Sequence, residues 1–452
     1  MTTRSHLLVS GLLALGPAAP AMYADAVPTA ERTTTPQARA TATTSAAAVR
    51  VPGNLTGLGF DTCQAPDQTT MDTLRTTSPF WGVGVYIGGA ERGCAQPELT
   101  ATWVRTQAAK KWRIFPIWVA RQSQCADRQD TEDPFTHLIS RNNLQAKQQG
   151  REAASAAVRA ASGLAMAKGS TLFLDVEAYD NTTSACNQPV MNYQSGWSQR
   201  LHALGWKAGF YSAALSGIKA LDYVRATFPG TYVMPDAIWF AHDNGVATTD
   251  GDPWVRDSFW TTQRVHQYRI DVERTYGGVQ QVIDMNAIRI GRGSVAPKAG
   301  HNCGGVRLDF SPYQSLSRGE VSPQVKAAQC LLRQRGLYDG RLVERYTPAT
   351  AWAVRQFQDR RGLRVTGALN PSTWTALLSA GTQPLLKRGS AADRVRFLQR
   401  ALRPALARKL EVTGVVNSVT EVAVKRYQRA VGHPVTGVVT RATWKALQDG
   451  LR

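Results

Sequence analysis

A self-match at a fixed offset of 70 residues constrains the C-terminal third of this 452-residue chain more than any other feature. Arg318-Gly319 recurs as Arg388-Gly389, and Thr373-Trp374 recurs as Thr443-Trp444. The remaining matches pair Gln329 with Gln399, Leu332 with Leu402, Arg333 with Arg403, Thr350 with Thr420, Val354 with Val424, Gln358 with Gln428, Leu377 with Leu447, and residues 365–367 with 435–437. Identities at one offset indicate a duplicated module, so both copies are expected to share one fold.

Each copy is predicted to be an all-α bundle of three helices, over residues 314–381 and 384–452. In the first copy, apolar residues recur at helical spacing over 325–332, 351–358 and 371–378. Gly336 can end the first helix, and Trp374 is expected to face inward. Most repeated residues are therefore expected to form the core and turns of the module rather than to touch a ligand.

These motifs resemble the peptidoglycan-binding domain family, whose members are three-helix modules attached to wall hydrolases. The resemblance is carried by Tyr338-Asp339-Gly340 and Val365-Thr366-Gly367, together with the repeated glutamines and Thr373-Trp374. It covers nearly all of residues 317–451. The second copy has Leu-Glu-Val-Thr-Gly at 410–414 where the first has an Asp-Gly turn. One copy is therefore expected to bind more weakly.

Upstream of the repeats, short apolar runs alternate with helical stretches such as 101–110 and 145–168. The eight runs are 58–61, 82–87, 113–119, 171–176, 207–211, 237–241, 264–268 and 281–286. Eight strand–helix alternations over ~235 residues predict an α/β fold, a (β/α)8 barrel of the TIM type, over residues 56–292. The alternative is an open doubly wound sheet, although no Gly-rich nucleotide loop follows any run.

Acidic residues end three of the predicted strands, at Asp61, at Asp175 and Glu177, and at Asp284. Residues two apart on a strand point to the same face, so Asp175 and Glu177 are expected to project together while Val176 turns away. Function in such barrels lies at the C-terminal strand ends. Glycoside hydrolysis needs one carboxylic acid and nearby negative charge. We therefore predict Glu177 as the general acid and the three aspartates as supporting carboxylates, one of them a nucleophile or the stabiliser of an acetamido intermediate.

Other polar and aromatic residues near predicted strand ends are candidates for binding substrate. They are Tyr86, Trp118, Tyr211, Trp239, Gln267 and Tyr268. Core packing is the alternative role for the aromatic residues among them, and His242 and His266 are predicted to be structural or peripheral. The carboxylates could also form a metal site, but no histidine supports it, so no metal or cofactor is expected.

The barrel segment resembles two known families. Gly59-Phe60-Asp61, Asp175-Val176-Glu177 and His266-Gln267-Tyr268 are similar to motifs of barrel muramidases with an Asp-x-Glu signature. Residues 59–66 and 84–89 are more closely similar to a glycoside-hydrolase-like family of secreted actinobacterial proteins. The resemblance implies Glu177 as acid with Asp61, Asp175 and Asp284 in support. Loops such as 179–189 depart from the muramidase pattern, and activity is not generally established in the closer family.

Three functions follow from these observations: cleavage of the peptidoglycan glycan strand, non-catalytic binding of wall glycan, and hydrolysis of another polysaccharide. The N-terminus favours secretion, because Arg4 and His6 precede an apolar run over 7–15 and a small-x-small site at Ala24-Asp25-Ala26. We assign 1–26 as a signal peptide, the Thr/Ala-rich segment 27–55 as a disordered linker, and 293–313 as a second linker.

Six cysteines in an oxidising compartment predict disulfides. Fifteen pairings are possible in principle. Our expectation pairs neighbours along the chain, giving Cys63–Cys94, Cys125–Cys186 and Cys303–Cys330, with free buried thiols as the alternative. The absence of a C-x-x-C spacing argues against zinc.

The net charge of +20 is concentrated in the repeats, where residues 311–452 carry 24 Lys and Arg against 8 Asp and Glu, or +16. Such a charge favours an anionic partner, here peptidoglycan or another anionic wall polymer. Nucleic acid is not expected, because stacking aromatics are not interleaved with the basic residues. No apolar run reaches the ~18 residues of a membrane span. A secreted, wall-associated monomer is expected.

Overall fold

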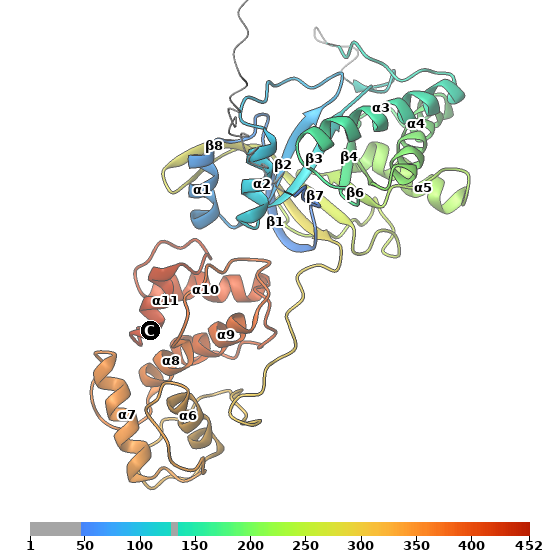
Figure 1. Ribbon diagram of the computed structural model, residues 1–452. Helices are drawn as coiled ribbons and strands as arrows, with labels where there is room; N and C mark the ends of the chain where they lie inside the picture. Colours follow the sequence, from blue (N-terminus) through green and yellow to red (C-terminus); the bar gives the residue numbers. More distant parts are fainter. Residues whose placement is uncertain (1–46, 128–133) are drawn as a thin grey trace, which may run out of the picture. The chain divides into compact units, whose positions relative to one another are not determined.

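The structure is a computed structural model that describes residues 47–127 and 134–452 (Figure 1). The predicted signal peptide and residues 27–46 of the predicted linker lie outside the described residues. Packing begins at Val49, which forms a bridge with Met166, and Val51 is buried in the core. The described barrel domain therefore includes residues that we had assigned to the linker.

Eight strands close into a barrel in sequence order, which confirms the predicted architecture. They are β1 (Leu55–Asp61), β2 (Phe80–Gly88), β3 (Arg113–Val119), β4 (Thr171–Asp175), β5 (Lys207–Ala213), β6 (Ala237–Ala241), β7 (Arg264–Tyr276) and β8 (Val279–Ile290). Strands β1 to β7 run parallel, whereas β8 is antiparallel to both β7 and β1. Alternation of strand and helix stops at β6, because no α-helix of the described chain separates β6 from β7 or β7 from β8.

A two-glycine hairpin accounts for this reversal. Tyr276 pairs with Val279, and Gly277 and Gly278 between them have φ of +59° and +84°. Two-residue turns of this kind need positive φ at both central positions, which glycine adopts readily. The turn leaves no room for a helix, so β8 returns beside β7. Both strands extend beyond the predicted runs because their outer parts are largely polar and exposed, where apolar alternation fades.

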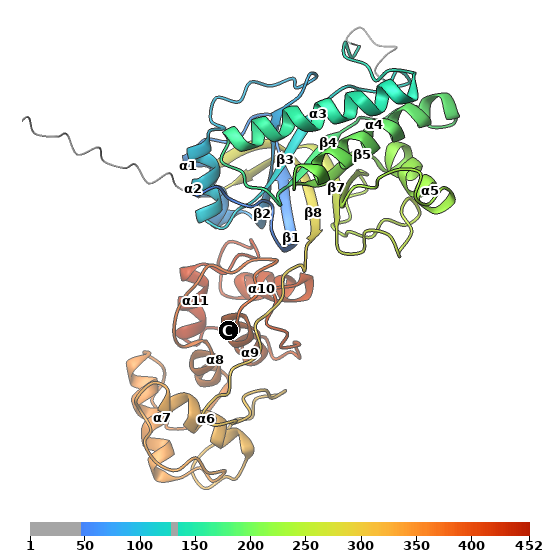
Figure 2. The same ribbon diagram turned by 45° about the vertical axis from the view of Figure 1, so that its right-hand side comes forward.

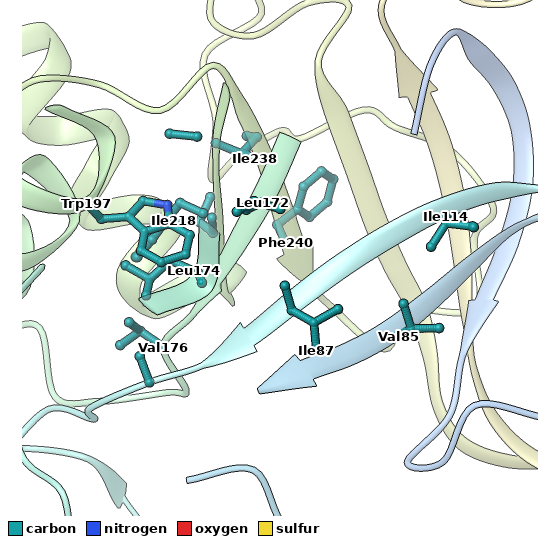
Figure 3. Close-up of a cluster of buried hydrophobic side chains, with 14 of the residues drawn as sticks. Val85, Ile87, Ile114, Leu172, Leu174, Val176, Trp197, Ile218, Ile238 and Phe240 are labelled. Atoms are coloured by element: carbon teal, nitrogen blue, oxygen red, sulfur yellow. The ribbon is translucent and has the colours of Figure 1, made fainter. Parts of the chain in front are cut away.

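Side chains alternate between the barrel interior and an outer layer under the helices, as period-two geometry requires. Along β4, Phe173 packs in the interior cluster with Phe115 and Trp239. Leu174 and Val176 belong to the outer cluster, which Figure 3 shows together with Ile238, Phe240 and other buried residues. Val176 thus turns away from its neighbours Asp175 and Glu177, as predicted.

Five α-helices surround the described barrel. They are α1 (Gln68–Thr77), α2 (Ala101–Ala109), α3 (Asn143–Gly163), α4 (Ser184–Ala203) and α5 (Lys219–Thr227). Helices α3 and α4 lie side by side (Figure 2). Their closest approach is at two glycines: a Cβ on Gly150 would lie 2.0 Å from the carbonyl oxygen of Tyr193, and one on Gly196 would lie 2.0 Å from that of Lys147.

Each repeat is a three-helix module, which confirms the prediction. The first contains α6 (Pro323–Arg333), α7 (Pro348–Arg360) and α8 (Pro371–Ser379), and the second α9 (Asp393–Leu406), α10 (Ser418–Ala430) and α11 (Arg441–Gln448). The repeated glutamines are buried hydrogen-bond hubs: Gln329 donates to Thr350 Oγ1 at 2.9 Å, and Gln399 donates to Thr420 Oγ1 at 3.0 Å. These repeated residues therefore hold the fold together. Among the described residues, no helix has the length and apolar character needed to cross a membrane.

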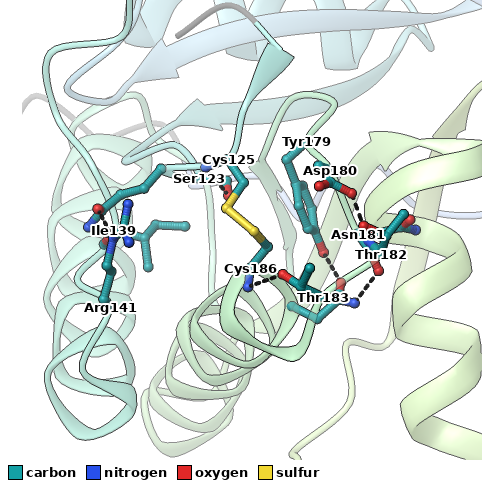
Figure 4. The surroundings of a disulfide bond; sticks show 12 residues. Ser123, Cys125, Ile139, Arg141, Tyr179, Asp180, Asn181, Thr182, Thr183 and Cys186 are labelled. Carbon is teal, nitrogen blue, oxygen red and sulfur yellow. Dashed lines mark hydrogen bonds between the residues drawn. A yellow bond between two sulfur atoms is a disulfide. The ribbon is translucent and has the colours of Figure 1, made fainter.

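The three predicted disulfides are all present. Cys63–Cys94 joins the segments that follow β1 and β2, and Cys125–Cys186 joins the segment after β3 to the first turn of α4 (Figure 4). Cys303–Cys330 ties the segment before the repeats to α6. The first two bonds restrain loops at the C-terminal ends of the barrel strands.

We predict that Gly150→Ala destabilises the barrel domain. The added methyl group must push the α3 and α4 backbones apart, and overpacking of this kind costs about 1–3 kcal/mol. Gly163→Ala is the matched control, because it lies in the same helix and its Cβ would meet no atom within 4 Å. Urea unfolding of the two variants measures the difference, and equal free energies of unfolding would contradict the close glycine contact.

Candidate active site

The four predicted carboxylates gather at the end of the barrel where the parallel strands finish. Asp61 is the last residue of β1, Asp175 is the last residue of β4, and Glu177 follows two residues later. Asp284 is paired directly opposite Asp61. Because β8 is antiparallel, Asp284 lies in the middle of its strand, and our placement of it at a strand end was wrong. Its strand still carries it to the same mouth.

Asp61 is buried and surrounded by neutral donors. Its Oδ1 accepts a hydrogen bond from Asn286 Nδ2 at 2.5 Å, and its Oδ2 accepts from Tyr86 Oη and Gln267 Nε2, both at 3.3 Å. Burial, reinforced by the charge of Asp284, raises the pKa of Asp61 well above its usual value. The surrounding amide and hydroxyl donors offset part of that rise. Asp61 therefore holds a proton more readily than an exposed aspartate.

Asp284 is linked to Asp61 by the same glutamine. Gln267 Nε2 donates to Asp284 Oδ2 at 2.9 Å, and the backbone N–H of Asp271 donates to Asp284 Oδ1 at 2.7 Å. Burial raises the pKa of Asp284 to about 6. The Gln267 carbonyl oxygen accepts from Tyr211 Oη at 2.9 Å, so one amide joins both carboxylates to a tyrosine.

Asp175 and Glu177 form the second acidic pair. Asp175 is buried, whereas Glu177 is partly exposed. Burial raises the pKa of Asp175 well above its usual value, and the charges of Glu177 and Asp61 add to the effect. Within the described residues, Asp175 Oδ1 has no hydrogen-bond partner. Ionisation is costly for a buried carboxyl group when one of its oxygens receives no hydrogen bond, so this end of β4 favours a protonated state.

Gln122 fixes the backbone that carries this pair, and sequence analysis missed it. Its Oε1 accepts from the Glu177 N–H at 2.8 Å, and its Nε2 donates to the Asp175 carbonyl oxygen at 3.1 Å. The side-chain amide thus acts like a peptide group that continues the β3–β4 ladder past Asp175. Gln122 is itself held through backbone hydrogen bonds with His137 and Ile139. Nothing in the sequence near Gln122 distinguishes it, because its partner lies 55 residues away.

A cavity of about 450 Å³ opens beside Asp175 and Glu177. Its other lining residues are Cys63, Tyr86, Glu91, Arg92, Gly93, Cys94, Val119, Asp127, Phe135 and Ala178. The disulfide Cys63–Cys94 therefore forms part of its wall. Asp61 and Asp284 do not line it, but Tyr86 connects it to Asp61 through the hydrogen bond described above. Glu91 Oε1 accepts from the backbone N–H of Thr136 at 3.1 Å, which joins two loops beside the cavity.

The predicted binding residues separate into three groups. Tyr86, Tyr211 and Gln267 lie at the mouth and bond to the carboxylate network. Burial and nearby carboxylates raise the pKa of both tyrosines well above the usual value, so both remain donors. Trp239 is buried in the interior, where its Nε1 donates to Asn286 Oδ1 at 2.8 Å. Its ring supports the network from below and is covered by other side chains.

Trp118 and Tyr268, which we also predicted to bind substrate, lie in the outer layer of the barrel domain. Trp118 packs against the outer cluster, because its neighbours Ile117 and Val119 occupy the interior positions of β3. Tyr268 is buried in the outer cluster, one residue beyond the inward Gln267. Trp118 lies near the end of β3, whereas Tyr268 lies within β7, which continues to Tyr276. His266 is structural, with its ring nitrogens 2.7 and 3.0 Å from the carbonyl oxygens of Thr248 and His242.

Sequence profiles of two known families match the chain. The profile described as "Rv2525c-like, glycoside hydrolase-like domain" matches residues 72–288, and the profile "Putative peptidoglycan binding domain" matches residues 321–377 and 391–447. The chain therefore contains an Rv2525c-like, glycoside hydrolase-like domain. Two peptidoglycan-binding domains follow its Rv2525c-like domain.

One curated relative is 35% identical over 99 residues, which span 21% of this chain and 81% of the relative. It is described as "Uncharacterized protein in bpoA1 3'region" from Kitasatospora aureofaciens. Three solved structures are similar at low identity: an uncharacterized protein of B. stearothermophilus (19% identity, 52% of this chain, 96% of that chain, TM-score 0.35), the modular autolysin LytC of Streptococcus pneumoniae (13%, 51%, 46%, 0.32) and a family 25 glycosyl hydrolase of Bacillus anthracis (15%, 51%, 88%, 0.30). At these TM-scores the likenesses carry no argument about function.

The Rv2525c-like domain offers carboxylates without the other usual ligands of a metal. Among the described residues, no group of three or more His, Cys, Asp or Glu side chains is arranged to hold a metal ion. The acids at the mouth are instead partnered by amides and tyrosines. That arrangement suits proton transfer between carboxyl groups and a bound ligand.

We predict that Asp284 makes the stability of the Rv2525c-like domain fall as pH rises. Because the folded-state pKa of about 6 lies above the ordinary 3.8, the unfolded chain ionises first. Stability that is present below about pH 4 is therefore lost between about pH 4 and pH 6. Asp284→Asn removes this contribution. Urea unfolding at pH 4 and pH 7 should show a smaller loss for the variant than for the wild type, and equal losses would contradict the raised pKa.

Proposed function

We propose that the protein is a secreted, cell-wall-associated glycoside hydrolase that cleaves glycan strands of peptidoglycan, in the manner of a muramidase. The observation that carries the proposal is the partly exposed Glu177 beside a cavity, next to a buried aspartate that resists ionisation. The two peptidoglycan-binding domains support the choice of polymer. We also propose the domain boundaries given above, except that the hydrolase-like domain begins at Val49, where its packing starts, and not at residue 56.

In this mechanism, Glu177 donates a proton to the glycosidic oxygen as the bond to the anomeric carbon breaks. Asp175, two residues earlier on the same face, is the nearest carboxyl group to the developing positive charge. While protonated, it orients an acetamido group of the substrate that attacks the anomeric carbon; once ionised, it stabilises the developing charge. Asp61 and Asp284 lie behind and hold Tyr86 and Gln267 in place. Gln122 keeps the backbone of both reacting carboxyl groups fixed.

The positions of two tyrosines beside the carboxylates indicate which residues bind the substrate. Tyr86 lines the cavity, and Tyr211 reaches the carboxylate network through Gln267. We propose Tyr86 and Tyr211 as substrate-binding residues, with Trp239 as a support beneath them. The basic repeats would concentrate the protein on a wall rich in carboxylates and phosphates.

The proposal predicts that Glu177→Gln abolishes most hydrolysis while leaving the fold intact. Loss of a general acid lowers a rate by about 10²- to 10⁴-fold. Purified peptidoglycan is incubated with each protein, and reducing ends and product masses are measured. Glu152→Gln is the matched control, because Glu152 is exposed on α3, outside the cavity lining.

Equal release of reducing ends by wild type and Glu177→Gln would contradict this mechanism. No release from either protein, with both still sedimenting with wall sacculi, would favour the non-catalytic wall-binding protein. Product masses that fit a different polymer would favour hydrolysis of another polysaccharide. In each case, deletion of residues 311–452 shows how much wall binding depends on the repeats.

A further inference from the structure

An apolar groove with basic residues along its edge lies in the second peptidoglycan-binding module. It has a volume of about 440 Å³ and lies between the end of α9 and the start of α10. Its apolar lining residues are Leu402, Leu406, Leu410, Val419, Val422 and Ala423. Val419 and Val422 are 61% and 49% exposed. Clustered aliphatic side chains that remain open to solvent are typical of a binding surface.

Three cations line the same groove: Arg408, Lys409 and Arg426. All three are exposed, and none forms a salt bridge with an acidic residue in the described part of the chain. The neighbouring acid Glu421 is already paired with Arg388 and Lys425. The groove therefore presents positive charge that the module does not neutralise, which favours an anionic ligand.

Local backbone geometry builds this groove. Helix α9 ends at Leu406, and Ala407 adopts a left-handed conformation with φ of +50°. That turn brings Arg408 and Lys409 back beside the helix. On α10, residues 419, 422, 423 and 426 recur at the spacing of one helix face. The basic and the aliphatic lining residues are thus fixed by the same two elements.

The first copy is chemically different at the equivalent positions. Seventy residues earlier, Tyr338, Asp339 and Trp352 stand where the second copy has Arg408, Lys409 and Val422, and Gln356 stands in place of Arg426. Trp352 is 58% exposed, so the first copy presents an aromatic ring there. The second copy presents aliphatic groups and cations. The two copies are therefore suited to different ligands, and departure from the Asp-Gly turn adds to the groove of the second copy.

We propose that this groove binds the peptide stem of peptidoglycan rather than its glycan strand. The proposal rests on the proposed wall-binding function. A stem is a short peptide that combines alanine methyl groups with free carboxylates, which matches an aliphatic groove lined by cations. None of the ten residues lining the groove is aromatic, so no flat ring is available for a sugar to stack on.

The experiment uses the full chain with Glu177→Gln, so that bound glycan stays intact. Binding is measured by sedimentation with intact sacculi, with sacculi whose stems an amidase has removed, and in competition with a synthetic N-acetylated acidic stem tetrapeptide. We expect Arg426→Glu and Lys409→Glu each to weaken binding of the tetrapeptide about tenfold, because each replaces an attraction with a repulsion. Arg429→Glu is the matched control: it makes the same charge change on an exposed residue of α10 that does not line the groove.

The inference stands if Arg429→Glu changes tetrapeptide binding less than twofold and if stem removal abolishes the difference between the variants. It is overturned if the control weakens binding as much as Arg426→Glu, because the effect would then be general charge. It is also overturned if binding to stem-free sacculi still depends on Arg426, which would indicate an anion elsewhere in the wall. Failure of the wild-type chain to bind any sacculi would instead overturn the proposed wall function itself, and the inference with it. Thermal unfolding confirms that each variant is folded.

Discussion

Closure of the barrel by the antiparallel strand β8 is the constraint on which the candidate site depends. β8 pairs with β1 on one side and with β7 on the other, so Asp284 faces Asp61 and Asn286 faces Gln267. These pairings bring two carboxylates and two amides into one network without any help from loops. An open sheet would leave Asp61 at an edge in contact with water, where its ordinary ionisation would return.

The network balances two opposing effects. Burial makes ionised carboxylates costly, whereas hydrogen bonds from amides and tyrosines stabilise the charge that remains. Asp61 receives three such donors, but Asp175 receives none at Oδ1 within the described chain. The two buried aspartates therefore differ in their hydrogen bonding. Asp61, away from the cavity, accepts several hydrogen bonds, whereas Asp175, beside the cavity, has one oxygen that accepts none within the described chain. Because their surroundings differ, neighbouring acids can have different protonation states at the same pH.

The sequence was sufficient to predict the closed barrel and the duplicated three-helix modules, and the expected pairing of neighbouring cysteines is the one present. It also placed Asp175 and Glu177 on one face, because period two is a strict property of strands. The sequence did not reveal that Trp118 and Tyr268 face outward, because the face that each residue occupies depends on the register of its strand, which tertiary pairing sets. The reversed direction of β8 depends on a short turn at Gly277, a signal that the apolar runs did not contain.

Gln122 illustrates what a single sequence cannot reveal. It forms two hydrogen bonds to backbone atoms that lie 53 and 55 residues away in the sequence. Any asparagine or glutamine side chain has the donor and acceptor needed for such a pair of hydrogen bonds. Only the fold identifies which amide it is. The same holds for the groove of the second module, where the relevant cations come from separate elements.

The covalent bonds beside the cavity have a consequence for how the family can diversify. Cys63–Cys94 joins the loop after β1 to the loop after β2, and Cys125–Cys186 joins the loop after β3 to the first turn of α4. Both bonds hold neighbouring loops together close to the strand ends, so the parts of these loops away from the cysteines can change in length without moving the cross-linked residues. The loops around the cavity can therefore vary in length while Asp61 and Asp175 keep their positions at the ends of β1 and β4.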